Sequence, residues 1–176
     1  MKKYYLLILI FSFSFSGIKI GIDIGADINF DEGGSDDLEM GISLAYETNK
    51  KNSKYNFGLE YLFPTELDDS DAEISILTGY AKYEFFNDNS IKLSGIIGYS
   101  FPDIDVDGFN PYQLDGGLMF GFEANYGRIN FAYTIHNGEL ELDLGSLYSY
   151  YGYYGYNSGS FEQDITLNRL TLSYLF

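Results

Sequence analysis

Three acidic residues at alternate positions come closest to a metal-binding pattern. Asp103, Asp105 and Asp107 precede Gly108, and this spacing would place three carboxylates on one side of a turn that the glycine permits. In a calcium-binding EF-hand, the twelfth loop position carries a bidentate glutamate, whereas this chain has Leu114 there. The stretch therefore predicts a partial site for Ca2+ or another divalent cation, and we expect no other cofactor.

A tract of tyrosine and glycine between residues 148 and 156 is the second candidate site. Tyrosine provides a rigid, amphipathic contact surface, so the tract could bind an extracellular protein or stack on a glycan. Paired aromatic residues that simply extend a hairpin are the structural alternative. The side chains concerned are Tyr148, Tyr150, Tyr151, Tyr153, Tyr154 and Tyr156.

Acidic residues outnumber basic ones by 26 to 10, and the formal net charge is −16 at pH 7. This balance argues against nucleic-acid binding, which needs a basic surface. The chain has no cysteine, so disulfides and thiolate chemistry are excluded. Most of the acids fall in stretches that we expect to be loops or strand extensions, where they form a repulsive, solvated surface or, alternatively, bind divalent cations that bridge to lipid phosphates.

Apolar and polar side chains alternate along most of the chain, which predicts β-strands. From Ile18 to Phe30, every second residue is apolar, and these residues, Ile28 among them, would lie on one face of a strand. Beyond Asn137-Gly138 the apolar residues change parity, which is consistent with a bulge there. The expected strands are Ile18–Phe30, Leu38–Thr48, Lys54–Phe63, Ile74–Phe86, Ile91–Phe101, Tyr112–Tyr126, Arg128–Ile135 and a last strand that closes at Phe176.

Eight such strands predict an all-β fold, namely an eight-stranded, antiparallel, up-and-down transmembrane β-barrel with an apolar outer face. A soluble barrel with its apolar face inside is the structural rival, but it would crowd the interior with tyrosine hydroxyls that need partners. An eight-stranded lumen is wide enough only for side chains. We expect it to hold a charge network of Lys19, Asp23, Asp27, Glu39, Glu60, Lys82, Lys92, Glu123, Arg128 and Arg169.

The two ends of the chain indicate export. Lys2 and Lys3 precede the apolar stretch Tyr4–Phe15 and small residues, which predicts a signal peptide over residues 1–16 and a barrel domain over 17–176. Short connections such as Asn49–Ser53 alternate with long ones such as Pro64–Glu73, Pro102–Pro111 and Asn137–Glu162. This asymmetry predicts that both termini lie in the periplasm.

The end of the chain resembles the carboxy-terminal strand of bacterial outer-membrane barrels, in which alternating apolar residues and a final phenylalanine are the assembly signal. The matching residues are Leu170, Leu172, Tyr174 and Phe176. Together with Leu93–Tyr99 and Leu118–Glu123, they make residues 18–176 resemble the small outer-membrane β-barrel domain family, the OmpA/OmpX-like proteins. This resemblance implies the outer membrane of a Gram-negative-type bacterium, contact with outer-membrane lipid, and the barrel-assembly machinery as a partner during biogenesis.

Members of that family have many activities, so the resemblance does not define one. We expect a monomer with an envelope-structural or surface-binding and adhesion role, carried by its acidic and tyrosine-rich outer loops. A narrow porin for small solutes is the alternative. A lipid A-modifying enzyme is the remote one, because Ile135–Gly138 is distantly similar to lipid A deacylases. Gly138 stands where they have a nucleophilic serine, and no acid partner for His136 can be assigned, so no enzymatic activity is expected.

Overall fold

The computed structural model describes residues 16–31, 33–48, 53–68, 70–88, 90–106, 112–143 and 159–176. These residues form ten strands, and among them no helix is long and apolar enough to span a bilayer. The strands are β1 (Ser16–Phe30), β2 (Ser35–Asp37), β3 (Ile42–Thr48), β4 (Tyr55–Leu67), β5 (Ser70–Asp88), β6 (Ile91–Val106), β7 (Tyr112–Asp115), β8 (Gly117–Tyr126), β9 (Ile129–Asp143) and β10 (Ser160–Leu175).

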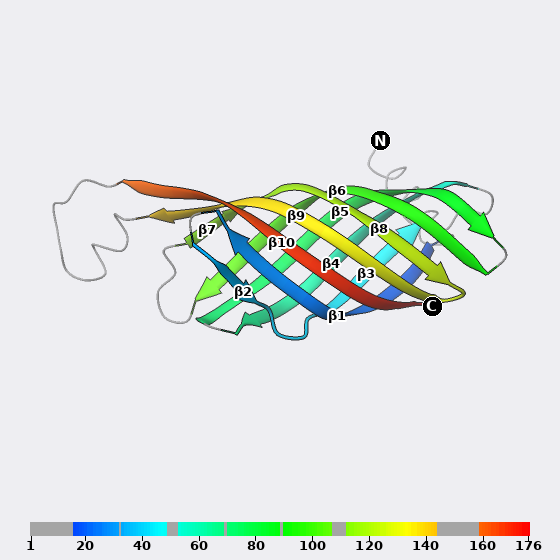
Figure 1. Ribbon diagram of the computed structural model, residues 1–176, viewed down its shortest axis with the longest axis horizontal. Helices are drawn as coiled ribbons and strands as arrows, with labels where there is room; N and C mark the ends of the chain where they lie inside the picture. The colour runs from blue at the N-terminus through cyan, green and yellow to red at the C-terminus, as the bar shows by residue number, and fades with distance from the viewer. Residues whose placement is uncertain are drawn as a thin grey trace, which may run out of the picture.

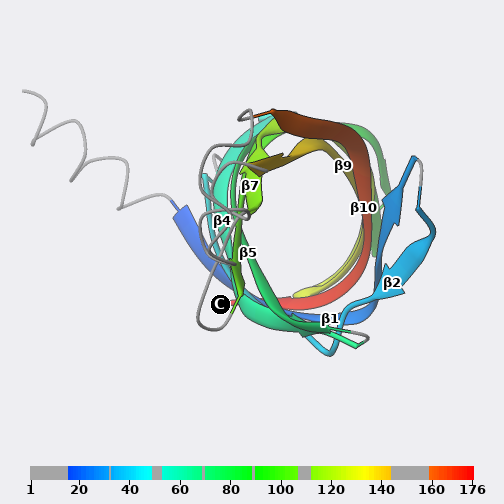
Figure 2. The same cartoon turned by 90° about the vertical axis from the view of Figure 1, so that its left-hand side faces the viewer.

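Eight of these strands form a closed antiparallel ring. Its order is β1, β3, β4, β5, β6, β8, β9 and β10, and β10 pairs with β1 to close it. The strands run obliquely along the barrel (Figure 1), and the end-on view shows the ring (Figure 2). The short strands β2 and β7 pair with β1 and β9. The predicted eight-stranded barrel is therefore confirmed.

The two ends of the barrel differ. At the short-turn end, β10 finishes and β8 turns into β9 through Gly127, whose φ of 63° suits a glycine. At the opposite, long-loop end, the strands continue well past their predicted limits. β4 reaches Leu67, β5 begins at Ser70, and β9 reaches Asp143. Within the stretches predicted as the loops Pro64–Glu73, Pro102–Pro111 and Asn137–Glu162, nearly all of the residues that the structure describes are strand, and we call this part of the barrel the extension.

The polarity of the two barrel faces reverses along the strands. Toward the short-turn end, large apolar side chains such as Phe122 (67% exposed) point outward and charged ones point inward. Toward the long-loop end, from the last residues of the predicted strands into the extension, the inward side chains are mostly apolar and tightly packed, with Leu62 at 0% and Ile76 at 2% exposure. This core, called the apolar plug below, consists of Ile28, Leu38, Leu62, Leu67, Ala72, Ile74, Ile76, Leu114, Ile165 and Leu167.

Bulges in two strands turn the side chains that follow them toward the apolar plug. In β1 the register against β10 shifts between Asp23 and Gly25, so the side chains beyond it change face. The prediction that Ile28 lies on the outward face was therefore wrong, because Ile28 is only 1% exposed. In β4 a second shift falls between Leu62 and Thr65, around Pro64, which has no N–H to give to a strand ladder.

Leu38 was also predicted to face outward but is buried in the plug. It precedes β3, and its own pairing is an isolated bridge to Leu67 of β4. The bulge predicted in β9 at Asn137-Gly138 is absent, since β9 pairs with β10 in one unbroken register. Leu140 simply lies on the same inward face as His136. The irregularity is in the facing strand, where Gly116 separates β7 from β8.

Candidate functional site

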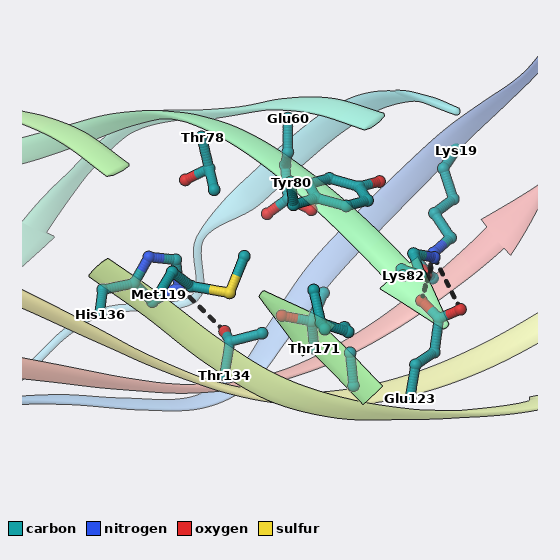
Figure 3. A pocket seen from close by; sticks show the side chains of 13 residues that line it. Lys19, Glu60, Thr78, Tyr80, Lys82, Met119, Glu123, Thr134, His136 and Thr171 are labelled. Carbon is teal, nitrogen blue, oxygen red and sulfur yellow. Dashed lines mark hydrogen bonds and ion pairs between the residues drawn. The ribbon is translucent and has the colours of Figure 1, made fainter. Parts of the chain in front are cut away.

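Four charged side chains from four strands form a closed ring of ion pairs inside the barrel. Lys82 of β5 contacts Glu47 of β3 at 2.5 Å and Glu123 of β8 at 2.8 Å. Lys19 of β1 lies 3.4 Å from Glu47 and also contacts Glu123. Figure 3 shows Lys19 and Lys82 meeting at the Glu123 carboxylate. Each cation bridges both anions, so the buried charges compensate one another.

Arg169 of β10 organises a second cluster deeper in the barrel. Its Nε and Nη2 donate to the two carboxylate oxygens of Asp23 at 2.8 and 3.1 Å, a bidentate geometry. Nη1 donates to Glu60 at 2.8 Å, and the Thr171 hydroxyl donates to Asp23 at 2.6 Å. The guanidinium, 1% exposed, therefore ties β10 to β1 and β4.

His136 sits in a chain of hydroxyl groups. Its Nδ1 lies 2.6 Å from Ser100 Oγ and its Nε2 lies 2.9 Å from Thr134 Oγ1. Thr78 Oγ1 continues the chain at 3.1 Å from Ser100. A serine beside a histidine is the pairing of a nucleophile with a base. Here Ser100 is 1% exposed, and the adjoining cavity of about 30 Å³ has room for about one water, not for a substrate.

Side chains fill the lumen, apart from small polar cavities. One interior cavity, of about 150 Å³, lies toward the short-turn end and is lined by Lys19, Glu84, Lys92 and Asn125 among others. Tyr80 closes over Gly58, where a Cβ atom would lie only 2.1 Å from the tyrosine ring. Toward the long-loop end the apolar plug follows. The described residues thus show a packed interior.

The structure brings together some of the predicted lumen charges and separates others. Lys19, Asp23, Glu60, Lys82, Glu123 and Arg169 meet in the two clusters. Lys92 lies at the short-turn mouth, half exposed, and pairs with Glu84 at 3.2 Å. The remaining three lie elsewhere. Asp27 follows the β1 bulge and accepts a hydrogen bond from Asn168 at 3.0 Å, Glu39 is exposed between β2 and β3, and Arg128 is exposed in the Gly127 turn.

Acidic side chains line up across neighbouring strands on the outside of the extension. Glu139 of β9 stands directly opposite Asp115 of β7 and Asp164 of β10. On β4, β5 and β6, Glu73 stands opposite Glu66 and Asp105. We call these two sets the acid rows. Like charges directly opposite each other destabilise a sheet, so the acid rows cost stability where they stand.

The Glu139 carboxyl shows this electrostatic cost most clearly. Partial desolvation first, and then repulsion from Glu162, Asp164, Asp115 and Glu141, raise its pKa above the ordinary value of 4.5. A carboxyl whose pKa is raised by folding stabilises the folded state in full below its ordinary pKa. That contribution is lost as the pH rises through the raised pKa.

We therefore expect the β9–β10 part of the extension to be more protected from hydrogen exchange at pH 4 than at pH 7, after correction for intrinsic exchange rates. Glu139→Gln should raise protection at pH 7 and shrink the difference between the two pH values. Asp88→Asn, at the other end of the barrel, serves as the matched control and should leave β9–β10 unchanged. Equal protection at both pH values in the wild type would contradict this result.

The other predicted site residues lie apart from the lumen. Asp103 and Asp105 belong to the extended strand β6, paired with Ser75 and Glu73, where a calcium loop would need a turn. Asp107 lies outside the described residues, as do all the tyrosines of the 148–156 tract. Within the described ranges, no group of three or more acidic or histidine side chains is placed to hold a metal ion. Leu170, Tyr174 and Phe176 point outward, with exposures of 40, 41 and 64%, and Leu172 lies on the same face, partly exposed.

The sequence interpretation missed Ser100, Thr78 and the apolar plug as interior features. A signal for Ser100 existed, since it lies at even spacing from the inward Ser94 on the same strand. For the plug, Ile74 and Ile76 continue the inward parity of Thr78 and Tyr80. An apolar core inside the barrel is not predicted, because the lumen is expected to hold a charge network.

The closed antiparallel ring, the outward apolar band and the charge-filled lumen define the fold of a small outer-membrane β-barrel. Among solved structures, the chain is similar to Neisserial surface protein A, with a TM-score of 0.57 and 11% identity over 92% of this chain and 97% of that one. It is also similar to Ail, the attachment invasion locus protein of Yersinia pestis, with a TM-score of 0.52 and 14% identity over the same shares. No protein-family model and no curated protein sequence matches the chain.

Proposed function

We propose that this protein is a non-enzymatic outer-membrane anchor that presents an acidic, rigid extension outside the cell for binding a cationic partner surface. The observation that carries the proposal is the change of the outward face from apolar side chains to the acid rows. Phe101 of β6 is 58% exposed, and the next two outward residues of that strand are Asp103 and Asp105. An apolar band suits the hydrocarbon layer, and carboxylates suit water.

The lengths of the connections support the proposed orientation. Short turns face the periplasm in such barrels, and longer loops face outward. The Gly127 turn lies at the same end as the end of β10, while the extension, with the end of β9 and the start of β10, lies at the other. The attachment in the name of Ail and the surface in the name of Neisserial surface protein A concern those proteins, and they are compatible with a binding role for this barrel.

Binding to a cationic surface tests the proposal. Liposomes carrying the full chain should bind amine-coated beads more than carboxylate-coated beads, and added salt should weaken the binding because it screens exposed charges. A variant with both acid rows neutralised (Glu66→Gln, Glu73→Gln, Asp105→Asn, Asp115→Asn, Glu139→Gln and Asp164→Asn) should lose most of this preference. Lys54→Gln is the control that changes charge at the other end.

A deletion of residues 148–156 separates the acid rows from the tyrosine tract. If the deletion abolishes binding while the neutralised variant binds normally, the tract is the binding site and the acid rows are not. In planar bilayers the filled lumen predicts no single-channel steps. Regular conductance steps would contradict the role of a closed anchor.

A further inference from the structure

An apolar groove lies on the outer surface of the barrel, outside the site described above. It has a volume of about 400 Å³ and is bordered by side chains of β4, β5, β6 and β8. Its floor is formed at Ala81 and Gly95, and its walls are formed by Tyr55, Tyr83, Ile97, Phe120 and Phe122. These wall residues all point outward, with exposures between 43% for Tyr83 and 67% for Phe122.

The strand register explains the shape of the groove. Gly95 stands between Tyr83 and Phe122 on its two neighbouring strands, so a position without a side chain is enclosed by two large rings. Ala81 stands opposite Ile97, which in turn stands opposite Phe120. A Cβ atom at Gly95 would meet nothing within 4 Å, so the space above this residue is open.

The position of the groove identifies what can enter it. It is continuous with the outward apolar band, and no outward-pointing side chain around it carries a charge. Tyr55 and Tyr83, whose rings lie 5.1 Å apart, border it toward the short-turn end, where interfacial tyrosines suit the headgroup level. We propose that this groove holds one acyl chain of a phospholipid from the leaflet nearer the short-turn end. The inference depends on the proposed membrane location.

Photo-crosslinking in liposomes tests this inference. The full chain is placed in phosphatidylethanolamine and phosphatidylglycerol with a small share of phospholipid that carries a diazirine on its acyl chain. Peptides that contain Ala81, Gly95 and Phe120–Phe122 should be labelled several-fold more than other outward peptides. Gly95→Leu fills open space and should reduce that labelling several-fold. Gly79→Leu is the matched control, because Gly79 also has an open outward face but does not line the groove.

Each other outcome overturns the proposal in a distinct way. Even labelling around the barrel, unaffected by Gly95→Leu, would show ordinary lipid contact without a site. Crosslinks between two copies of the chain through these peptides would assign the groove to self-association. Absence of labelling along the whole outward apolar band would contradict the membrane location itself. Heat-dependent mobility on gels establishes that both variants are folded before labelling.

Discussion

Replacing Arg169 with methionine is expected to lower the free energy of unfolding of the barrel by about 3–5 kcal/mol, the usual cost of removing one partner from a buried ion pair. The guanidinium is 1% exposed and serves both Asp23 and Glu60. Without it, two carboxylates from different strands face each other inside the lumen with no cation between them. Urea unfolding of the protein in lipid vesicles measures the loss.

Two further variants show whether charge is the cause. Arg128→Met removes an exposed arginine and should stay within about 0.5 kcal/mol of the wild type. Combining Arg169→Met with Asp23→Asn and Glu60→Gln removes the stranded charges and should recover a large part of the stability. If Arg169→Met lowers the free energy of unfolding no more than Arg128→Met does, the cluster around Arg169 does not hold β10 to β1 and β4 as inferred.

Truncating Leu62 to alanine should lower the free energy of unfolding by about 2–5 kcal/mol, because it opens a cavity in a packed core. Leu62 is 0% exposed and belongs to the apolar plug. Leu59, on the same strand but 52% exposed on the outward band, provides the matched truncation. Leu59→Ala should cost clearly less, since lipid chains can fill the space that its methyl groups leave.

The same unfolding assay compares the two alanine variants directly. A plug that is packed as described gives a larger loss for Leu62→Ala than for Leu59→Ala. Equal losses, or a larger loss for Leu59→Ala, would mean that the interior of the extension is not a tight core.

The eight strands could be predicted because, within the outward band, each follows a simple alternation of apolar and polar residues. Lys19, Asp23 and Arg169 were predicted in the lumen for the same reason, as each shares the parity of charged or small neighbours. Their partners across the barrel could not be predicted, because contacts such as Arg169 with Glu60 depend on strand tilt and depth as well as on parity.

The extension could not be predicted by that rule because the surrounding solvent changes along a strand. Where water replaces lipid outside, apolar residues such as Ile165 and Leu167 move to the inside and acids such as Asp164 move to the outside. If the outer face of every strand is expected to be apolar, as it is in the membrane band, these acidic stretches look like loops. The prediction for Ile28 was wrong for a different reason. The bulge after Asp23 leaves no sign in the sequence, because the alternation of apolar and polar residues continues through it.

The reversal of polarity between the band and the extension is the central claim, and spin-label accessibility along β9 tests it most directly. Single cysteines at Phe131, Tyr133, Glu139, Glu141 and Leu140 are labelled in lipid vesicles. Labels at Phe131 and Tyr133 should be relaxed mainly by oxygen, which concentrates in hydrocarbon. Labels at Glu139 and Glu141 should be relaxed mainly by a water-soluble nickel complex, and the label at Leu140 by neither. Oxygen-dominated relaxation at Glu139 and Glu141, or free access of nickel to Leu140, would contradict the account.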